Sequence, residues 1–160
     1  MEETCNCTYS RSLMSDLDDL LSPMHCVSHT LQRTARLVAG VYAEELRTCG
    51  LGRSQFPLLE SLDAAGGSLA TSDLAQRLDL DRTTLTRVLG PLVGSGLVDR
   101  AADPGDARVR RISLTEAGRA RLAEGRTAWR RAQARTLDRI GPEAWRALEH
   151  DLRRLRRALA

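Results

Sequence analysis

The chain has few aromatic residues, no lysine and no long apolar run. Only 3% of its 160 residues are aromatic, which is too few for the rows of stacked rings that bind single-stranded nucleic acid. No apolar run approaches the roughly 20 residues that a membrane span needs. The N-terminus is acidic and lacks the basic-then-apolar order of a secretory signal, so we expect a soluble, cytoplasmic protein with no membrane partner.

The sequence also lacks the residue patterns of common catalytic and disulfide-bonded proteins. Four cysteines are too few and too unevenly spaced to predict the disulfide framework of a small secreted domain. There is no Ser-His-Asp or Cys-His arrangement with supporting spacing, no phosphate-binding loop and no pair of carboxylates in an apolar setting. We therefore expect no enzyme, no cofactor and no bound metal ion.

Charge is distributed unevenly along the chain. All 24 basic residues are arginine, set against 21 acidic residues, for a formal net charge of +3. Residues 1–22 contain five acidic residues and one arginine, whereas residues 119–160 contain twelve arginines and five acidic residues. We expect residues 1–22 to form an acidic N-terminal tail and residues 23–160 to form one folded domain.

Apolar residues recur at three- and four-residue steps in much of the chain, which predicts helices. One long helix is expected over about 24–48. Two shorter helices meet at the tight turn Asp79-Leu80-Asp81, where Asp81 is placed to cap the second helix, which ends at Ser95-Gly96. The expected buried residues of this second short helix are Leu85, Val88, Leu89, Leu92 and Val93.

A hairpin and two further helices complete the predicted order. The turn signal Asp103-Pro104-Gly105-Asp106 precedes an alternating segment from Arg108 to Leu114, which predicts the return strand of a hairpin. Thr115 is placed to cap a helix to about Ile140, and a Gly-Pro pair separates that helix from the last one. Two short helices followed by a hairpin form a winged helix-turn-helix. The predicted fold is therefore mainly α with a small β-hairpin wing.

The second short helix has a polar face suited to the major groove of DNA. Thr83, Arg87 and Gly90 lie at i, i+4 and i+7, with no acidic or bulky apolar residue among them. Small hydroxyl groups allow close approach, and arginine binds guanine edges or phosphates. The alternative is an ordinary solvated face. The hairpin adds further positive charge through Arg100, Arg108, Arg110 and Arg111.

These segments together resemble the MarR family of transcriptional regulators. The resemblance rests on DRTTLTR at 81–87, GLV at 96–98, DPGDAR at 103–108 and LTEAG at 114–118, and it covers Val27 to the C-terminus. It implies that residues 81–94 form the recognition helix and that Arg108 is the wing arginine, with Asp106 as its orienting carboxylate. The expected contacts to double-stranded DNA are Arg82, Thr83, Thr84, Thr86, Arg87, Asp106, Arg108 and Arg110.

The last helix carries an apolar seam that we expect to pair with a second copy of the chain. The seam consists of Trp145, Leu148, Leu152, Leu155 and Leu159. Packing within the same chain is the alternative. With the family resemblance, we expect a homodimer in which a winged helix-turn-helix over about 53–115 is flanked by dimerisation helices over about 24–48 and 116–160. Such a dimer reads palindromic half-sites about one helical turn apart.

The resemblance also implies an effector cleft between the dimerisation helices and the DNA-reading part. The candidate residues are His29, Arg33, Tyr42 and Phe56. His29 and Arg33 lie four residues apart on one helix face, where they would suit a carboxylate or phenolate, so the expected effector is aromatic or phenolic. A solvated helix face is the alternative reading of this pair.

The leading prediction is a dimeric repressor that binds a palindromic operator and is released by a small-molecule effector. One alternative is a regulator of the same fold that responds to redox state or metal through Cys5, Cys7 and Cys26. A more remote alternative is a winged-helix module that binds another protein rather than DNA. The absence of acidic residues on the polar helix face favours DNA over that module.

Overall fold

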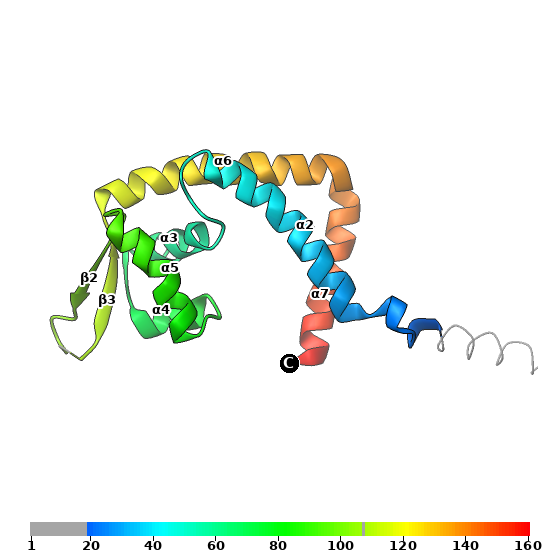
Figure 1. Cartoon of the computed structure of the whole chain (residues 1–160), viewed down its shortest axis with the longest axis horizontal. Coiled ribbons are helices and arrows are strands. Elements are labelled where there is room, and N and C mark those ends of the chain that lie inside the picture. The colour runs from blue at the N-terminus through cyan, green and yellow to red at the C-terminus, as the bar shows by residue number, and fades with distance from the viewer. Residues whose placement is uncertain (1–18, 107) are drawn as a thin grey trace, which may run out of the picture. The chain divides into compact units, whose positions relative to one another are not determined.

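The computed structural model describes residues 19–106 and 108–160, and these fall into two compact units that divide after Val38. Figure 1 shows the helices and strands along the chain. Their bounds are η1 (Pro23–His25), α2 (Val27–Arg47), α3 (Gln55–Asp63), β1 (Ser68–Ala70), α4 (Thr71–Arg77), α5 (Arg82–Gly94), β2 (Val98–Ala102), β3 (Arg110–Leu114), α6 (Glu116–Ile140) and α7 (Pro142–Leu159). The predicted fold class is confirmed, since helices dominate and the strands form one small antiparallel sheet.

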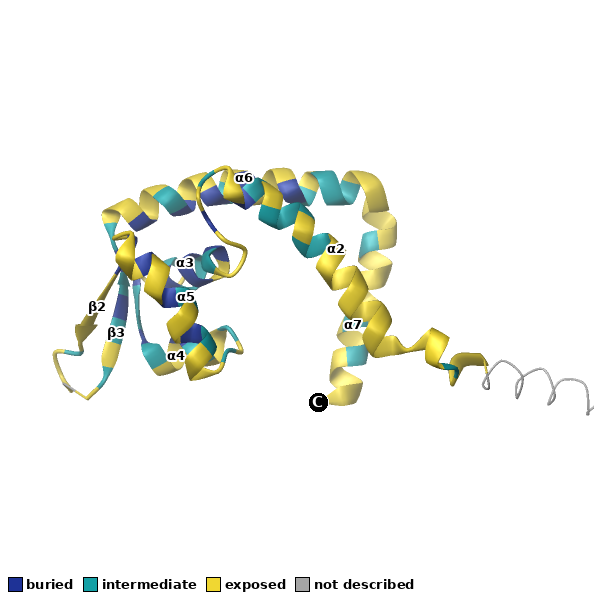
Figure 2. Cartoon of the chain, in the orientation of Figure 1, coloured by how far each residue is buried: buried dark blue, intermediate teal, exposed yellow. Residues whose placement is uncertain are grey.

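The first unit consists of η1 and the first turns of α2. Most of the predicted acidic tail lies outside the described residues. The apolar side chains at the start of α2 are exposed, with Val27 at 62% and Leu31 at 39%, and Leu46 near the other end is the one buried residue of this helix. The predicted helix is therefore present, but the described residues do not cover the first half of its apolar stripe (Figure 2).

The sheet has three strands in the order β1-β3-β2, one more than the predicted hairpin. The additional strand, β1, pairs with β3 so that Ser68 lies opposite Ser113 and Ala70 opposite Arg111. A three-residue strand is too short to show a hydrophobic alternation, and it is held in place by pairing with a segment more than 40 residues away. It could not be read from its own sequence.

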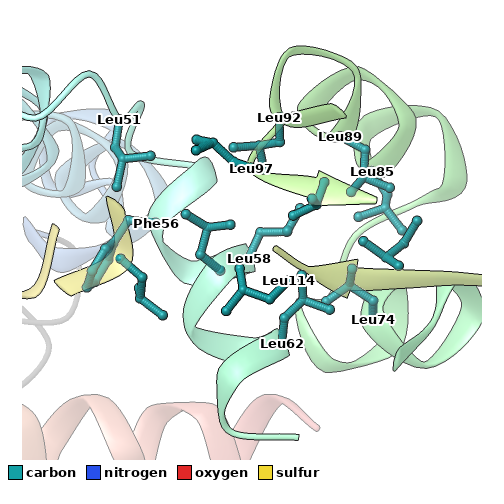
Figure 3. Packing of buried hydrophobic residues seen from close by; sticks show 14 of the residues in the cluster. Leu51, Phe56, Leu58, Leu62, Leu74, Leu85, Leu89, Leu92, Leu97 and Leu114 are labelled. Carbon is teal, nitrogen blue, oxygen red and sulfur yellow. The ribbon is translucent and has the colours of Figure 1, made fainter. Parts of the chain in front are cut away.

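The core of the second unit forms around α3. Leu58, Leu59 and Leu62 of this helix are fully buried. They lie in one cluster with leucines from α4, α5 and the end of β3 (Figure 3).

On α5, the predicted buried residue Val93 is instead 41% exposed. The reason is that its buried side chains, Leu85, Leu89 and Leu92, follow i, i+4 and i+7, and Val93 lies one residue beyond that stripe.

The predicted helix boundaries at α5 and α6 are confirmed by their capping contacts. Asp81 accepts a hydrogen bond from the Thr84 backbone N–H at 2.8 Å. Thr115 accepts one from the Gly118 N–H at 2.9 Å. Gly96, which follows α5, has a φ of 68°, a conformation that glycine adopts at little cost. These local signals fix where α5 begins and ends and where α6 begins.

Candidate functional site

Helices α4 and α5 are joined by the tight turn that the sequence predicts. Asp79 in this turn has a φ of 50°, in the left-handed region. The Leu80 N–H donates to the Ala75 carbonyl at 2.9 Å, which closes the turn. Buried Leu74 on α4 and Leu85 on α5 anchor both helices in the core. The two helices are therefore fixed to one another, and α5 keeps its polar face toward solvent.

The exposed face of α5 presents Arg82, Thr83, Thr86 and Arg87. Neither arginine takes part in an ion pair of the described residues. Thr84 differs from its neighbours, since it is half-buried and its hydroxyl donates to Asp81 Oδ2 at 2.7 Å. These hydrogen bonds lower the pKa of Asp81, so its carboxylate stays charged at the start of the helix.

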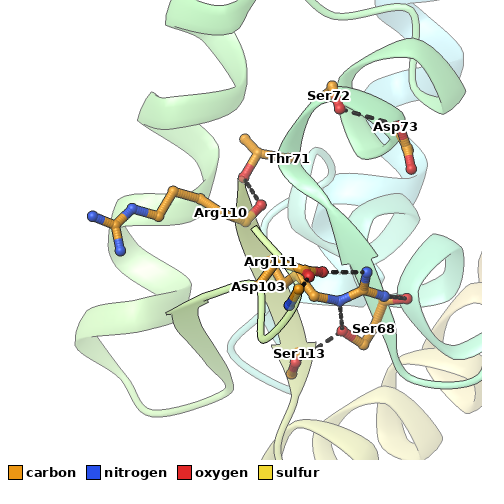
Figure 4. Close-up of polar contacts among 9 residues, drawn as sticks. Ser68, Thr71, Ser72, Asp73, Asp103, Arg110, Arg111 and Ser113 are labelled. Atoms are coloured by element: carbon orange, nitrogen blue, oxygen red, sulfur yellow. Dashed lines mark hydrogen bonds and ion pairs between the residues drawn. The ribbon is translucent and has the colours of Figure 1, made fainter. Parts of the chain in front are cut away.

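A polar cluster holds the wing against β1. The Arg111 guanidinium pairs with Asp103, with Nη1 and Oδ2 3.1 Å apart, and its Nε donates to Ser68 Oγ at 3.2 Å (Figure 4). Asp103 also accepts from the Gly105 N–H at 2.8 Å. The hydrogen bond from Gly105 and the pairing with Arg111 lower the pKa of Asp103. Although Arg111 belongs to the group of wing arginines, its charge is already neutralised in the chain.

The structure gives Asp106 a different contact from the one that the family resemblance implies. Its Oδ1 accepts a hydrogen bond from the backbone N–H of Arg108 at 2.9 Å, which shapes the turn of the wing. Among the described residues, no carboxylate forms an ion pair with the Arg108 guanidinium. Asp106 therefore positions the backbone of Arg108, and the guanidinium itself is left available to a partner.

A second feature is a cavity of about 870 Å³ in the second unit, bordered by α2, α3 and α6. It is lined by Tyr42, Phe56 and Trp129. The ring centroids of Tyr42 and Trp129 are 6.4 Å apart, and their ring planes are inclined by 52°. The Tyr42 hydroxyl donates to Gln133 Oε1. Burial raises the pKa of Tyr42, so the phenol stays neutral. The volume and the aromatic walls are typical of a site for a small organic molecule.

The cavity also contains charged groups from two sides. Arg126 on α6 forms two hydrogen bonds with Glu60 on α3, at 2.8 and 2.9 Å, and a third with Asp63 at 2.6 Å. These carboxylates raise the pKa of Arg126 and join α3 to α6. Arg53 and Arg130 also line the cavity but pair with no carboxylate of the described chain.

Of the four residues predicted for an effector site, Tyr42 and Phe56 line this cavity and His29 and Arg33 do not. His29 and Arg33 are exposed in the first unit. Their spacing places them on one helix face but contains no information about what that face meets. Sequence reasoning missed Arg53, Trp129 and Arg130, because segments more than 70 residues apart form the cavity. The one available signal was a rare tryptophan in an arginine-rich helix.

Two of the four cysteines, Cys26 and Cys49, lie within the described residues. Cys5 and Cys7 lie outside the described residues. Cys26 is exposed, and the Cys49 thiol donates to the Leu46 carbonyl at 3.1 Å. Within residues 19–106 and 108–160, no three His, Cys, Asp or Glu side chains gather as metal ligands would. The same residues include no helix with the length and apolar character needed to cross a membrane.

The chain is similar to known transcriptional regulators in sequence and in structure. Residues 50–109 match the model of the MarR family. An uncharacterized HTH-type transcriptional regulator of Bacillus subtilis, YxaD, is 32% identical over 98 residues, which cover 61% of this chain and 68% of that protein. The M. tuberculosis transcriptional regulator MosR, solved in complex with DNA, is 36% identical, with a TM-score of 0.71 over 84% of this chain and 96% of that one.

A third similarity concerns the fold alone. BpsR of Bordetella bronchiseptica, whose DNA binding is regulated by 6-hydroxynicotinic acid, is 23% identical, with a TM-score of 0.75 over 84% of this chain and 95% of that one. The matched family and the two closer relatives are transcriptional regulators. They confirm the expectation of a regulator rather than an enzyme.

Proposed function

The chain belongs to the MarR family of winged-helix transcriptional regulators, and we propose that it is a dimeric repressor released from a palindromic operator by a small-molecule effector. The observation that carries the DNA-binding part is the exposed face of α5, on which Arg82 and Arg87 have no carboxylate partner in the described chain. A groove-facing helix needs such unpaired donors, because their hydrogen bonds then go to bases and phosphates.

In this proposal, α5 enters the major groove and the wing lies along the neighbouring backbone and minor groove. Thr83, Thr86 and Arg87 contact base edges, and Arg82 contacts a phosphate at the start of the helix. Arg108 and Arg110 extend the interface from the wing. Thr84 and Asp106 support it from within, through the cap of α5 and the turn of the wing.

DNA binding is tested by fluorescence anisotropy with a labelled mixed-sequence duplex. We expect binding at low salt that weakens steeply as salt rises, because phosphate contacts release counterions. A folded protein that does not bind the duplex at low salt would contradict the proposed function. Binding that does not change with salt would contradict the proposed contacts to phosphates.

We propose a dimer because α7 leaves apolar side chains exposed. No residue of this helix is buried, and along its predicted seam Leu148 is 41% and Leu159 79% exposed. A second copy that packs on this seam would remove it from water, as pairing helices commonly do. Under this proposal, residues of about 24–48 and 116–160 dimerise and residues of about 53–115 read the DNA.

We expect Leu152→Arg to convert the dimer into monomers at micromolar concentration, because a charge would then have to be buried in the seam. Sedimentation velocity of the full chain measures the change. Arg157→Gln, on the opposite face of α7, is the matched control and is expected to stay dimeric. A Leu152→Arg protein that sediments like the unchanged chain would show that the seam packs elsewhere.

The effector is proposed to be a planar aromatic anion that occupies the cavity beside α3. Aromatic walls at Tyr42, Phe56 and Trp129 suit a ring, and the unpaired Arg53 and Arg130 suit a carboxylate or phenolate. The ligand would act on DNA binding through α3, which is held to α6 by Arg126 and packs against α4 and α5. An approximately hundredfold effect on DNA affinity needs a difference of about 2.7 kcal/mol between the two states.

We expect benzoate and 6-hydroxynicotinic acid to quench saturably the tryptophan emission of a Trp145→Phe chain, in which Trp129 is the remaining tryptophan, and benzamide, the neutral analogue of benzoate, to bind more weakly. Arg130→Gln should weaken binding of the acids by about tenfold, the loss of one charged hydrogen bond. Arg47→Gln, which does not line the cavity, is the control. Equal affinity for the acids and the amide would contradict an anion site.

A further inference from the structure

The register of the wing places two arginines on its inner face. Arg100 lies opposite Ile112, so both side chains point to the same side of the sheet. Ala102 lies opposite Arg110 in the same way. Ile112 is fully buried against the core, so this side of the sheet faces the helices. On that face Arg100 lies beside Ile112, and Arg110 lies two residues further toward the tip of the wing.

This face borders a cleft of about 330 Å³ between the wing and the helices α4 and α5. Four arginines line it: Arg82 from α5, and Arg100, Arg108 and Arg110 from the wing. The Thr71 hydroxyl at the start of α4 donates to the Arg110 carbonyl at 2.8 Å. This bond ties α4 to β3, so the two sides of the cleft are held at a fixed separation.

The cleft is strongly positive and has no counter-charge of its own. No aspartate or glutamate lines it, and none of the four arginines enters an ion pair of the described residues. Arg111 is the contrast, since its guanidinium is held by Asp103. Figure 4 shows Arg110 and Arg111 leaving β3 on opposite sides, with the cluster of Asp103 and Ser68 on the side of Arg111.

We propose that this cleft seats the sugar–phosphate strand that separates the major groove under α5 from the minor groove under the wing, with Arg100 as a phosphate contact. The inference rests on the proposed DNA binding. A strand must pass between two elements that occupy neighbouring grooves, and its phosphodiesters are the anions that meet this cleft. Arg100 contacts no base in this arrangement, so it adds affinity without sequence preference.

The test is the salt dependence of binding to a labelled mixed-sequence duplex. Removing one phosphate contact reduces the slope of log K against log salt by about 0.9 for each protomer. We expect Arg100→Gln to show this reduction and Arg100→Lys to keep the slope of the unchanged protein. Since Arg100 is exposed and its side chain makes no hydrogen bond among the described residues, both variants should fold normally, which circular dichroism checks.

The matched control is Arg111→Gln, which removes the same charge from the next strand but from the opposite face. It should lower the affinity severalfold, because the wing loses its tie to Asp103 and Ser68, while the slope stays unchanged. An Arg100→Gln protein with the original slope would overturn the phosphate contact. Equal loss of slope in both variants would also overturn it, by showing a general charge effect. An unchanged protein that binds no duplex would overturn the proposed function itself.

Discussion

Replacing Arg87 with alanine is expected to weaken binding to the operator by roughly 5- to 150-fold for each half-site, which corresponds to the loss of one bidentate contact to guanine per protomer, worth about 1–3 kcal/mol. Arg87 lies on the exposed face of α5, one turn after Thr83, and has no carboxylate partner among the described residues. Binding to mixed-sequence DNA should change much less, because that binding rests on phosphates.

The measurement compares dissociation constants for the operator and for a mixed-sequence duplex at one salt concentration. Arg47→Ala removes an exposed arginine at the end of α2 and is the control for loss of charge. If Arg87→Ala lowered both affinities by the same factor, Arg87 would contact the backbone rather than a base. In that case the assignment of α5 residues to base reading would be wrong.

Replacing Gly118 with alanine is expected to destabilise the fold by about 3 kcal/mol, although alanine normally stabilises a helix relative to glycine by up to about 1 kcal/mol. A Cβ atom at this position would lie 2.0 Å from the Leu97 carbonyl oxygen and 2.8 Å from Leu114 Cδ1. The carbonyl is backbone and cannot swing aside. It also accepts from the Thr115 N–H at 3.2 Å, so relieving the clash disturbs the start of α6.

Urea unfolding at one protein concentration measures this effect. Gly94→Ala is the matched control, since Gly94 is the last residue of α5 and nothing lies within 4 Å of its added Cβ. This control should be neutral or slightly stabilising. A Gly118→Ala protein as stable as the unchanged chain would show that α6 does not pack as closely on Leu97 as the structure has it.

The parts of the fold that sequence predicted are those with local causes. Asp81 and Thr115 cap helices through hydrogen bonds to residues three positions ahead, and Gly96 ends α5 by its own backbone conformation. Such contacts depend on neighbours in the sequence. The alternation in the return strand likewise separated Arg110 and Ile112 from Arg111, because strand geometry alone sets that order.

The parts that sequence reasoning missed depend on distant pairing. Strand β1 exists because β3 binds it, and the cavity exists because α6 brings Trp129 and Arg130 beside the start of α3. Arg111 could be placed on one face of β3, but its hydrogen bond to Ser68 required the third strand, β1. The exposure of the polar face of α5 was easier to predict, since a solvated helix face shows in the helical period.

Selection of binding sites from random duplex DNA, with the full chain at near-physiological salt, shows directly whether the protein reads a sequence as a dimer. We expect a two-fold palindrome whose half-sites are about one helical turn apart, because a dimer presents two copies of α5 to successive major grooves. Selection that yields no shared motif from folded, dimeric protein would contradict it.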